Sequence, residues 1–184
     1  MSQYQIAVLV GSLRQDSINR KLANAFNTLA PSDFSFKQLP IGGLPHYNED
    51  EENDPPESVQ RLKQDVAESQ GLIFVTPEYN RSIPGVLKNA IDHGSRPAGQ
   101  NVWAGKPAAI IGASDAPIGT VLAQQHLRNI LAYLDVPTMS RPDAMIHVPS
   151  GFFDEAGNFT NSDSRKFMLN WMDEFVFWVK SHNR

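Results

Sequence analysis

The sequence predicts an α/β domain in which helices cover both faces of a five-stranded parallel sheet. Short β-rich runs alternate with segments of helical spacing, a pattern typical of such sheets. A group of small polar residues directly follows the first β-rich run, at the sheet edge where this architecture binds ligands. With right-handed crossovers, these observations favour the strand order 2-1-3-4-5. A length of 184 residues suits one domain, and we expect residues 1–184 to form it.

The expected strands are apolar runs, and they cover residues 5–10, 34–39, 71–76, 107–114 and 136–140. The last of them has the weakest apolar pattern. The expected helices carry apolar residues at intervals of three and four, the period of one helix face. One helix covers the stripe from Ile18 to Leu29, and two others cover about residues 85–92 and 120–134. A last helix follows residue 164, and we assign its stripe to the core: Phe167, Trp171, Met172, Phe175, Trp178 and Val179.

The remaining helix follows the segment DPPE at residues 54–57. Asp54 is expected to cap this helix, Pro55 fits its first turn, and Glu57 completes a capping box. Gly71 is the expected stop.

The composition excludes several classes of function. Because the chain has no cysteine, it has no disulfide, thiolate metal site or thiol redox chemistry, and only a bound cofactor could hold electrons. The five histidines lack metal-ligand spacing, so we expect no metal. A net charge of −4 argues against a nucleic-acid surface. The apolar runs are too short to span a membrane and the first residues show no targeting pattern, so we expect a cytoplasmic protein.

The first candidate site is the segment VLVGSLRQDSINR at residues 8–20. It places Ser12, Arg14, Ser17 and Asn19 around a helix N-terminus, whose free N–H groups and dipole favour an anion. One guanidinium with several neutral donors suits a phosphate monoester. The alternative is that Ser17 only caps the helix and Arg14 is a surface residue. The segment matches neither the dinucleotide-binding nor the P-loop glycine pattern, which argues against a Rossmann dehydrogenase and a P-loop NTPase.

The second candidate site is the segment TPEYNRSIPGVLKNAID at residues 76–92, after the third expected strand. In the predicted strand order it faces the first loop across one crevice. Prolines stiffen it, and Gly85 is expected to allow a close backbone approach. A rigid loop with exposed amides can bind the edge of a flat heterocycle.

Together, GSLRxxSxN and PEYNxSxPGxLKNAID resemble the NADPH-dependent FMN reductase family, which includes bacterial quinone, azo-dye and chromate reductases. The likeness extends over essentially the whole chain. It includes LPHYNED at residues 44–50, GKPAAIIGAS at 105–114 and HLRNILAYLDV at 126–136. The resemblance implies a flavodoxin-like three-layer fold, bound FMN, and NADPH or NADH as the electron donor. It also implies small-molecule electron acceptors and a homodimer or homotetramer.

The resemblance also assigns roles to residues of both loops. The FMN phosphate and ribityl chain are expected at Ser12, Leu13, Arg14, Ser17, Ile18 and Asn19. The isoalloxazine is expected beside Pro77, Glu78, Tyr79, Asn80, Arg81 and Ser82, with Ser114 on the other side. Flavin N5 carries the chemistry, with ping-pong hydride transfer and no catalytic side chain. We therefore expect the Glu78 carboxylate either to order its loop or to point away from the site, and not to act as a base.

Several alternatives remain open from the sequence. Arg81 stands where relatives often have tyrosine, and it either biases the mouth of the site toward anionic acceptors or nicotinamide phosphates, or is a surface or subunit contact. Arg81, Arg96 and Lys106 are candidates for binding a nicotinamide 2′-phosphate. His93 and Asp115 also depart from the family pattern. A flavodoxin-type electron carrier or a flavin-binding regulatory protein is the rival function, although Arg14 and the modest charge favour the enzyme.

Overall fold

The computed structural model describes residues 4–183. These residues form a parallel five-stranded sheet in the order β2-β1-β3-β4-β5, which confirms the predicted order. The strands are β1 (Tyr4–Val10), β2 (Phe34–Gln38), β3 (Gly71–Val75), β4 (Ala108–Ser114) and β5 (Met145–His147). The helices are α1 (Ile18–Asn24), α2 (Phe26–Leu29), the short 3₁₀ turn η1 (Glu49–Glu51), α3 (Glu57–Glu68), α4 (Gly85–Ser95), α5 (Val121–Tyr133) and α6 (Ser162–His182).

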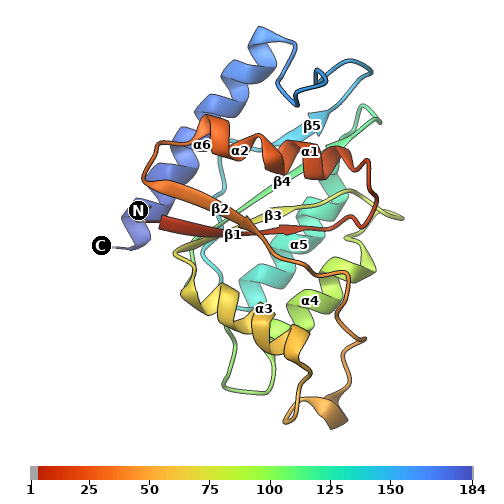
Figure 1. Cartoon of the computed structure of the whole chain (residues 1–184), viewed down its shortest axis with the longest axis vertical. Helices are drawn as coiled ribbons and strands as arrows, with labels where there is room; N and C mark the ends of the chain where they lie inside the picture. Colours follow the sequence, from red (N-terminus) through yellow and green to blue (C-terminus); the bar gives the residue numbers. More distant parts are fainter. Residues whose placement is uncertain (1–3, 184) are drawn as a thin grey trace.

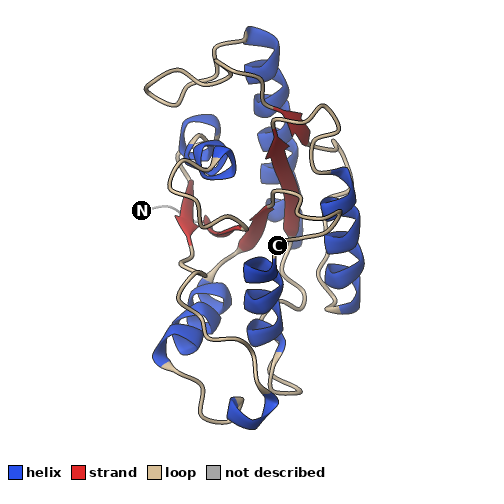
Figure 2. Cartoon of the chain, turned by 90° about the vertical axis from the view of Figure 1, so that its right-hand side faces the viewer, coloured by secondary structure: helices blue, strands red, loops and turns tan. Residues whose placement is uncertain are grey.

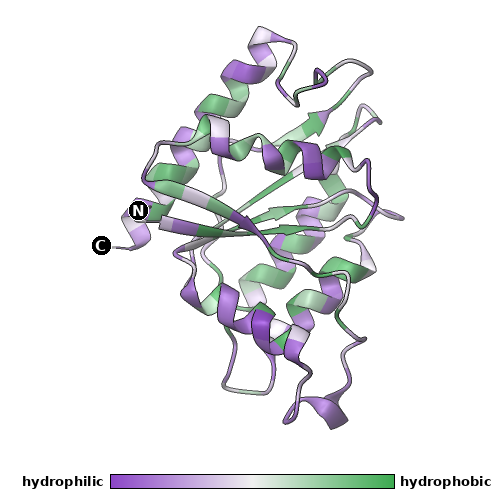
Figure 3. Ribbon diagram, in the orientation of Figure 1, coloured by the Kyte–Doolittle hydropathy of each residue, from purple (hydrophilic) through white to green (hydrophobic). Residues whose placement is uncertain are grey.

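Helices cover both faces of the sheet (Figures 1 and 2). The strands and α1, α2 and α6 enclose one hydrophobic core, and the strands and α3, α4 and α5 enclose the other. Along β1, Ile6 and Val8 face the first core whereas Ala7 and Leu9 face the second, which is the alternation of a strand. A sheet buried on both faces needs continuously apolar strands. Figure 3 shows these apolar strands between helices that carry hydrophilic residues outward.

The helix after DPPE begins differently from the prediction. Pro56 occupies the N-cap position of α3 without a side-chain hydrogen bond, and Asp54 lies outside the helix. A proline disfavours helical backbone in the residue before it, so two consecutive prolines move the start of the helix to Glu57. Gly71 does not stop the helix, which ends at Glu68, but begins β3. A Cβ at Gly71 would lie 3.0 Å from Val179, so the glycine lets α6 pack against the strand.

The last strand and part of the last stripe were also predicted wrongly. Residues 136–140 form only one isolated bridge, from Thr138 to Ala108, and β5 lies at Met145–His147. Because β5 is a three-residue edge strand with exposed ends, it has no apolar pattern to detect. In α6, Phe167 is exposed and Met168 enters the core in its place.

Two smaller observations concern helices. The predicted first helix is two helices, α1 and α2, which meet at Ala25. No protein group approaches Gly85 closely, because a Cβ there would meet nothing within 4 Å, so a close approach at Gly85 stays a prediction for a ligand. Across residues 4–183, no helix has the combination of length and hydropathy needed to cross a membrane.

The loops that follow β1, β3 and β4 lie at one edge of the sheet, on the right of Figure 1. At this edge the Gly11 N–H donates to the Val75 carbonyl at 2.8 Å, extending the β1–β3 pairing by one residue. A Cβ at Gly11 would lie 3.3 Å from Leu87 and 3.4 Å from Pro77. The absence of a side chain at Gly11 therefore lets the loops after β1 and β3 approach each other.

Candidate functional site

A cavity of about 270 Å³ lies where these three loops meet. Its lining residues come from all three loops: Ser12, Arg14, Asp16, Ser17, Ile18, Asn19, Pro77, Glu78, Tyr79, Ala113, Ser114 and Asp115. Small-molecule pockets typically measure about 300–1,000 Å³, so this cavity encloses part of a large ligand.

The loop after β1 presents unused hydrogen-bond donors to the cavity. Ser17 caps α1 by accepting a hydrogen bond from the Arg20 N–H at 3.3 Å, which leaves the proton of its hydroxyl available. Ser12 is also buried, and its carbonyl accepts from the Arg20 guanidinium at 3.3 Å. Within residues 4–183, the Arg14 side chain makes no hydrogen bond or ion pair. An uncommitted guanidinium beside two hydroxyls at a helix N-terminus is suited to a phosphate.

Asn19 has a different position from its neighbours in the motif. It is 2% exposed, and its side-chain amide donates to the Ala113 carbonyl at 2.9 Å and accepts from the Ala113 N–H at 2.9 Å. This paired bond fastens the first turn of α1 to the carboxyl end of β4. Asn19 lines the cavity, but its amide is largely occupied in holding two walls of the cavity together.

The loop after β3 is a tight hairpin. Tyr79 and Ser82 exchange two backbone hydrogen bonds of 3.0 Å, and the two residues between them, Asn80 and Arg81, have φ values of 51° and 65°. Positive φ at both central positions is the signature of a type I′ turn. The Ser82 hydroxyl lies 3.0 Å from His126 Nδ1, which attaches the hairpin to α5.

Glu78 joins the hairpin to the start of α5. Its Oε2 accepts from the N–H groups of Leu122 and Ala123, at 2.9 and 3.2 Å, and its Oε1 lies 3.4 Å from an Arg81 nitrogen. A carboxylate at this position satisfies free N–H groups and interacts favourably with the helix dipole. The prediction that Glu78 orders the loop is confirmed.

The third wall follows β4. The Ser114 hydroxyl accepts from the Ala116 N–H at 3.0 Å and so shapes the turn that carries Asp115. A Cβ at Gly112 would lie 2.1 Å from the Thr120 hydroxyl and 2.2 Å from the Thr76 carbonyl. Only glycine therefore allows β4 to pass this close to β3 and to the segment before α5.

The structure brings nine of the predicted site residues to one cavity: Ser12, Arg14, Ser17, Ile18, Asn19, Pro77, Glu78, Tyr79 and Ser114. The remaining four are outside its lining. The side chain of Leu13 is exposed and lies against Gly42. Asn80 and Arg81 form the exposed tip of the hairpin, and Ser82 contacts α5.

Sequence reasoning missed Asp16 and Ala113 as lining residues and gave no role to Asp115. Asp16 lies between two predicted ligands, so its position in the motif could have identified it. Ala113 contributes backbone, which residue type does not reveal. The lining thus contains three carboxylates, those of Asp16, Glu78 and Asp115, as well as the Arg14 guanidinium.

The three candidates for a nicotinamide phosphate separate in space. Lys106 lies before β4, and the eight residues from it to Ser114 at the site end of the strand extend about 26 Å at 3.3 Å per residue. Its ammonium donates to the carbonyls of Ala67 and Ser69, and burial lowers its pKa. Lys106 is therefore excluded from the site. Arg96 lines a separate small hollow with Tyr47 and His93, so only Arg81 is near the cavity.

His93 attaches the loop before η1 to α4. It is buried, its Nε2 lies 2.9 Å from the Pro45 carbonyl, and its ring meets the Tyr47 ring edge-on at 5.6 Å.

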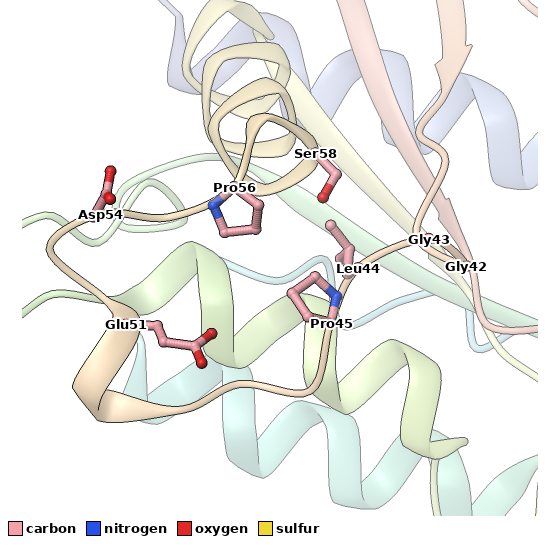
Figure 4. Close-up of a pocket in the computed structure, with 8 residues that line it drawn as sticks. All are labelled: Gly42, Gly43, Leu44, Pro45, Glu51, Asp54, Pro56 and Ser58. Atoms are coloured by element: carbon pink, nitrogen blue, oxygen red, sulfur yellow. The ribbon is translucent and has the colours of Figure 1, made fainter.

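A larger hollow of about 650 Å³ lies under the loop after β2 (Figure 4). Its polar side chains are Glu51, Asp54 and Ser58, and the rest of its lining is glycine, proline and leucine. No cation lines it, and no group of three or more His, Asp or Glu side chains within residues 4–183 is placed to hold a metal ion. The hollow is open and offers little chemistry, so the smaller cavity is the better functional site.

The donor set of that cavity fits FMN. Arg14 with the Ser12 and Ser17 hydroxyls matches a phosphate monoester, and the rigid hairpin that carries Tyr79 forms the opposite wall, against which a flat heterocycle can lie.

Comparison with known proteins agrees with this fit. The model of the family described as NADPH-dependent FMN reductase matches residues 4–149. The chain is 53% identical over 176 residues to a 2-hydroxy-1,4-benzoquinone reductase from Burkholderia sp, covering 96% of each protein. It is 48% identical over 182 residues to a quinone reductase from Pseudomonas putida, covering 98% of this chain and 97% of the relative.

Solved structures give the same result. The flavoenzyme NAD(P)H:(acceptor) oxidoreductase FerB from Paracoccus denitrificans superimposes with a TM-score of 0.94 at 46% identity, covering 97% of this chain and 98% of FerB. The chain therefore belongs to the NADPH-dependent FMN reductase family, and it is an oxidoreductase that uses FMN with NADPH or NADH.

Proposed function

We propose that this enzyme transfers two electrons from NADPH or NADH through bound FMN to quinones. In the net reaction, NAD(P)H, one proton and a quinone give NAD(P)⁺ and a hydroquinone. The relatives named as quinone reductases support this acceptor class. The observation that carries the proposal is the uncommitted Arg14 guanidinium facing a rigid hairpin across one cavity.

The residues of the chain bind and orient in this reaction. Arg14, Ser12 and Ser17 would hold the phosphate, and the hairpin that carries Tyr79 would lie beside the heterocycle. The chemistry that bound FMN would supply is two-electron transfer, with N5 of its ring as the hydride acceptor. The proposal includes that donor and acceptor use the same exposed face of the flavin in turn, which gives ping-pong kinetics.

The test is an absorption spectrum of the purified protein, followed by anaerobic titration with NADPH and NADH. We expect a flavin spectrum that either nucleotide bleaches and that a quinone restores. Initial rates at varied donor and acceptor concentrations should give parallel double-reciprocal lines. A protein that neither contains nor takes up FMN, or whose flavin resists both nucleotides, contradicts the proposal.

The rival function is a flavodoxin-type carrier or regulatory flavoprotein without its own turnover. Slow bleaching by nicotinamides together with a stable one-electron semiquinone would favour the carrier. The uncommitted cation at the phosphate loop favours the enzyme.

The wider acceptor range and the setting of the enzyme are part of the proposal. Azo dyes, chromate and free flavin are further acceptors, each testable by donor oxidation in its presence. We propose one FMN-binding domain over residues 1–184, a homodimer or homotetramer and a cytoplasmic location. Light scattering measures the oligomer, and cell fractionation measures the location.

A further inference from the structure

Arg81 occupies a backbone position that does not suit arginine. It is the second central residue of a type I′ turn with φ of 65°, where glycine is strongly preferred. A long side chain with a Cβ is strained in this left-handed region. Strain of this kind, retained at the edge of a site, points to a function of the side chain.

The charge of Arg81 is only weakly compensated. Within residues 4–183 its one ion-pair partner is Glu78, at 3.4 Å, and the Arg81 side chain is 67% exposed. The other oxygen of Glu78 accepts from two N–H groups at the positive end of α5, so this carboxylate already has favourable partners. The tip of the hairpin therefore presents a positive charge to an incoming molecule.

An aromatic residue stands on the same turn as this charge. Tyr79, two residues before Arg81, lines the cavity and is 46% exposed. The Tyr79–Ser82 backbone pair and the Ser82–His126 contact hold the hairpin in place, so the aromatic ring and the guanidinium are presented by one rigid turn. An aromatic ring and a cation carried by one rigid turn are complementary to a flat molecule with a negative substituent.

The rest of the cavity disfavours the same molecule. Asp16 and Asp115 line it in the loops after β1 and β4, and like charges repel an anion there. The third carboxylate of the lining, Glu78, is already paired with Arg81 and with two N–H groups of α5. Arg14, the other cation of the lining, is assigned to the FMN phosphate. The charge pattern thus directs a negative substituent toward the hairpin tip.

We propose that Arg81 is a specificity-determining residue that makes the enzyme prefer planar anionic quinones, such as sulfonated or ionised hydroxylated quinones, over neutral quinones of the same ring system. This inference rests on the proposed quinone reductase function. Of the alternatives stated for Arg81, it chooses the anionic acceptor, and the tests below distinguish this role from a nicotinamide phosphate and from a subunit contact.

The first test compares 1,4-naphthoquinone-2-sulfonate with neutral menadione as acceptors. In Arg81→Gln, the ratio of kcat/KM for the sulfonate over menadione should fall about tenfold, the effect of one charge-assisted hydrogen bond. The ratio cancels any change in flavin loading, because both acceptors use the same loaded enzyme. Arg81→Lys should retain most of the preference, and Arg81→Glu should lower the ratio further.

Arg61→Gln is the matched control. Arg61 also pairs with a nearby glutamate, at 3.6 Å, and its side chain is 59% exposed, but it lies on α3 beside a different hollow. This variant has the same change in net charge and should keep the wild-type ratio.

A second test needs no turnover. Naphthalene-2-sulfonate cannot act as a quinone, and calorimetric titration into FMN-loaded oxidised enzyme measures its binding directly. Its Kd should weaken about tenfold in Arg81→Gln and stay unchanged in Arg61→Gln.

Three outcomes overturn the inference. In the first, kcat/KM of Arg81→Gln falls equally for the sulfonate and for menadione. In the second, its ratio of kcat/KM for NADPH over NADH falls while the ratio for the two acceptors does not. In the third, the substitution changes only the oligomeric state. If the wild-type enzyme reduces neither quinone, the proposed function fails, and the naphthalene-2-sulfonate titration still decides whether Arg81 binds a planar anion.

Discussion

The loops after β1 and β3 lie side by side at one sheet edge, yet they use their polar groups in opposite ways. The loop after β1 leaves the Arg14 guanidinium and the protons of two serine hydroxyls uncommitted. The loop after β3 satisfies its polar groups within the protein: Glu78 caps α5, Ser82 contacts His126, and Tyr79 and Ser82 pair through their backbones. One loop is built to bind an anion, and the other is built to be rigid.

This difference predicts which property each substitution changes. Removing an uncommitted group weakens ligand binding and leaves the folded protein intact. Removing a committed group lowers the free energy of unfolding first. Asn19 is the exception within the loop after β1, because its amide is already hydrogen-bonded to the backbone of Ala113.

Asn19→Ala is expected to have the largest effect. It leaves the N–H and carbonyl of Ala113 buried without partners, so the free energy of unfolding should fall by about 2–4 kcal/mol. Urea unfolding of the apo protein measures this change. Asn24→Ala is the control, since Asn24 is an exposed residue of the same helix whose contact with Gln38 is at the surface. Equal effects of the two substitutions would show that Asn19 does not fasten α1 to β4.

Arg14→Ala is expected to weaken FMN binding by about 1.5–3 kcal/mol, the contribution of a charge-assisted hydrogen bond, with little change in apo stability. Fluorescence titration of apo protein with FMN measures the first quantity, and thermal unfolding measures the second. Unchanged FMN affinity in this variant would show that Arg14 does not bind FMN. The loop after β1 would then not be a phosphate-binding loop of the kind described above.

The sequence predicted this contrast only in part. The two loops and their strands were predictable because buried parallel strands are continuously apolar and the loop motifs are distinctive. Whether each polar group binds a ligand or another part of the protein was not predictable. An asparagine side chain can do either, and Asn19 bonds to the backbone because the fold places Ala113 beside it. β5 escaped detection for a related reason: a three-residue edge strand takes its place from pairing with β4 and not from its own composition.

Glu78→Ala tests the rigid loop. It removes the acceptor for two N–H groups of α5, and the free energy of unfolding should fall by about 1–2 kcal/mol, the usual effect of losing a helix cap. Chemical denaturation measures the loss. Glu57→Ala is the control, because the Glu57 side chain is 90% exposed and its pair with Arg61 is at the surface, where such pairs contribute about 0–1 kcal/mol. A larger effect on FMN affinity than on stability would place Glu78 in the binding class instead.

Arg81→Gly should have the smallest effect and the opposite sign. Glycine adopts the left-handed conformation without strain, so the free energy of unfolding should rise by about 0.5–1 kcal/mol even though a side chain is lost. Arg81→Ala is the matched control: it removes the same charge but keeps a Cβ at φ of 65°, and it should give no gain. The pair of variants separates backbone strain from the loss of the Glu78 contact, and thermal unfolding of both resolves the difference. A gain in stability confined to Arg81→Gly would show that the enzyme retains arginine at a cost in stability, as expected of a side chain kept for binding. Equal stabilities of the two variants would mean that the turn carries no strain. The inference from a strained backbone at Arg81 to a function of its side chain would then have no basis.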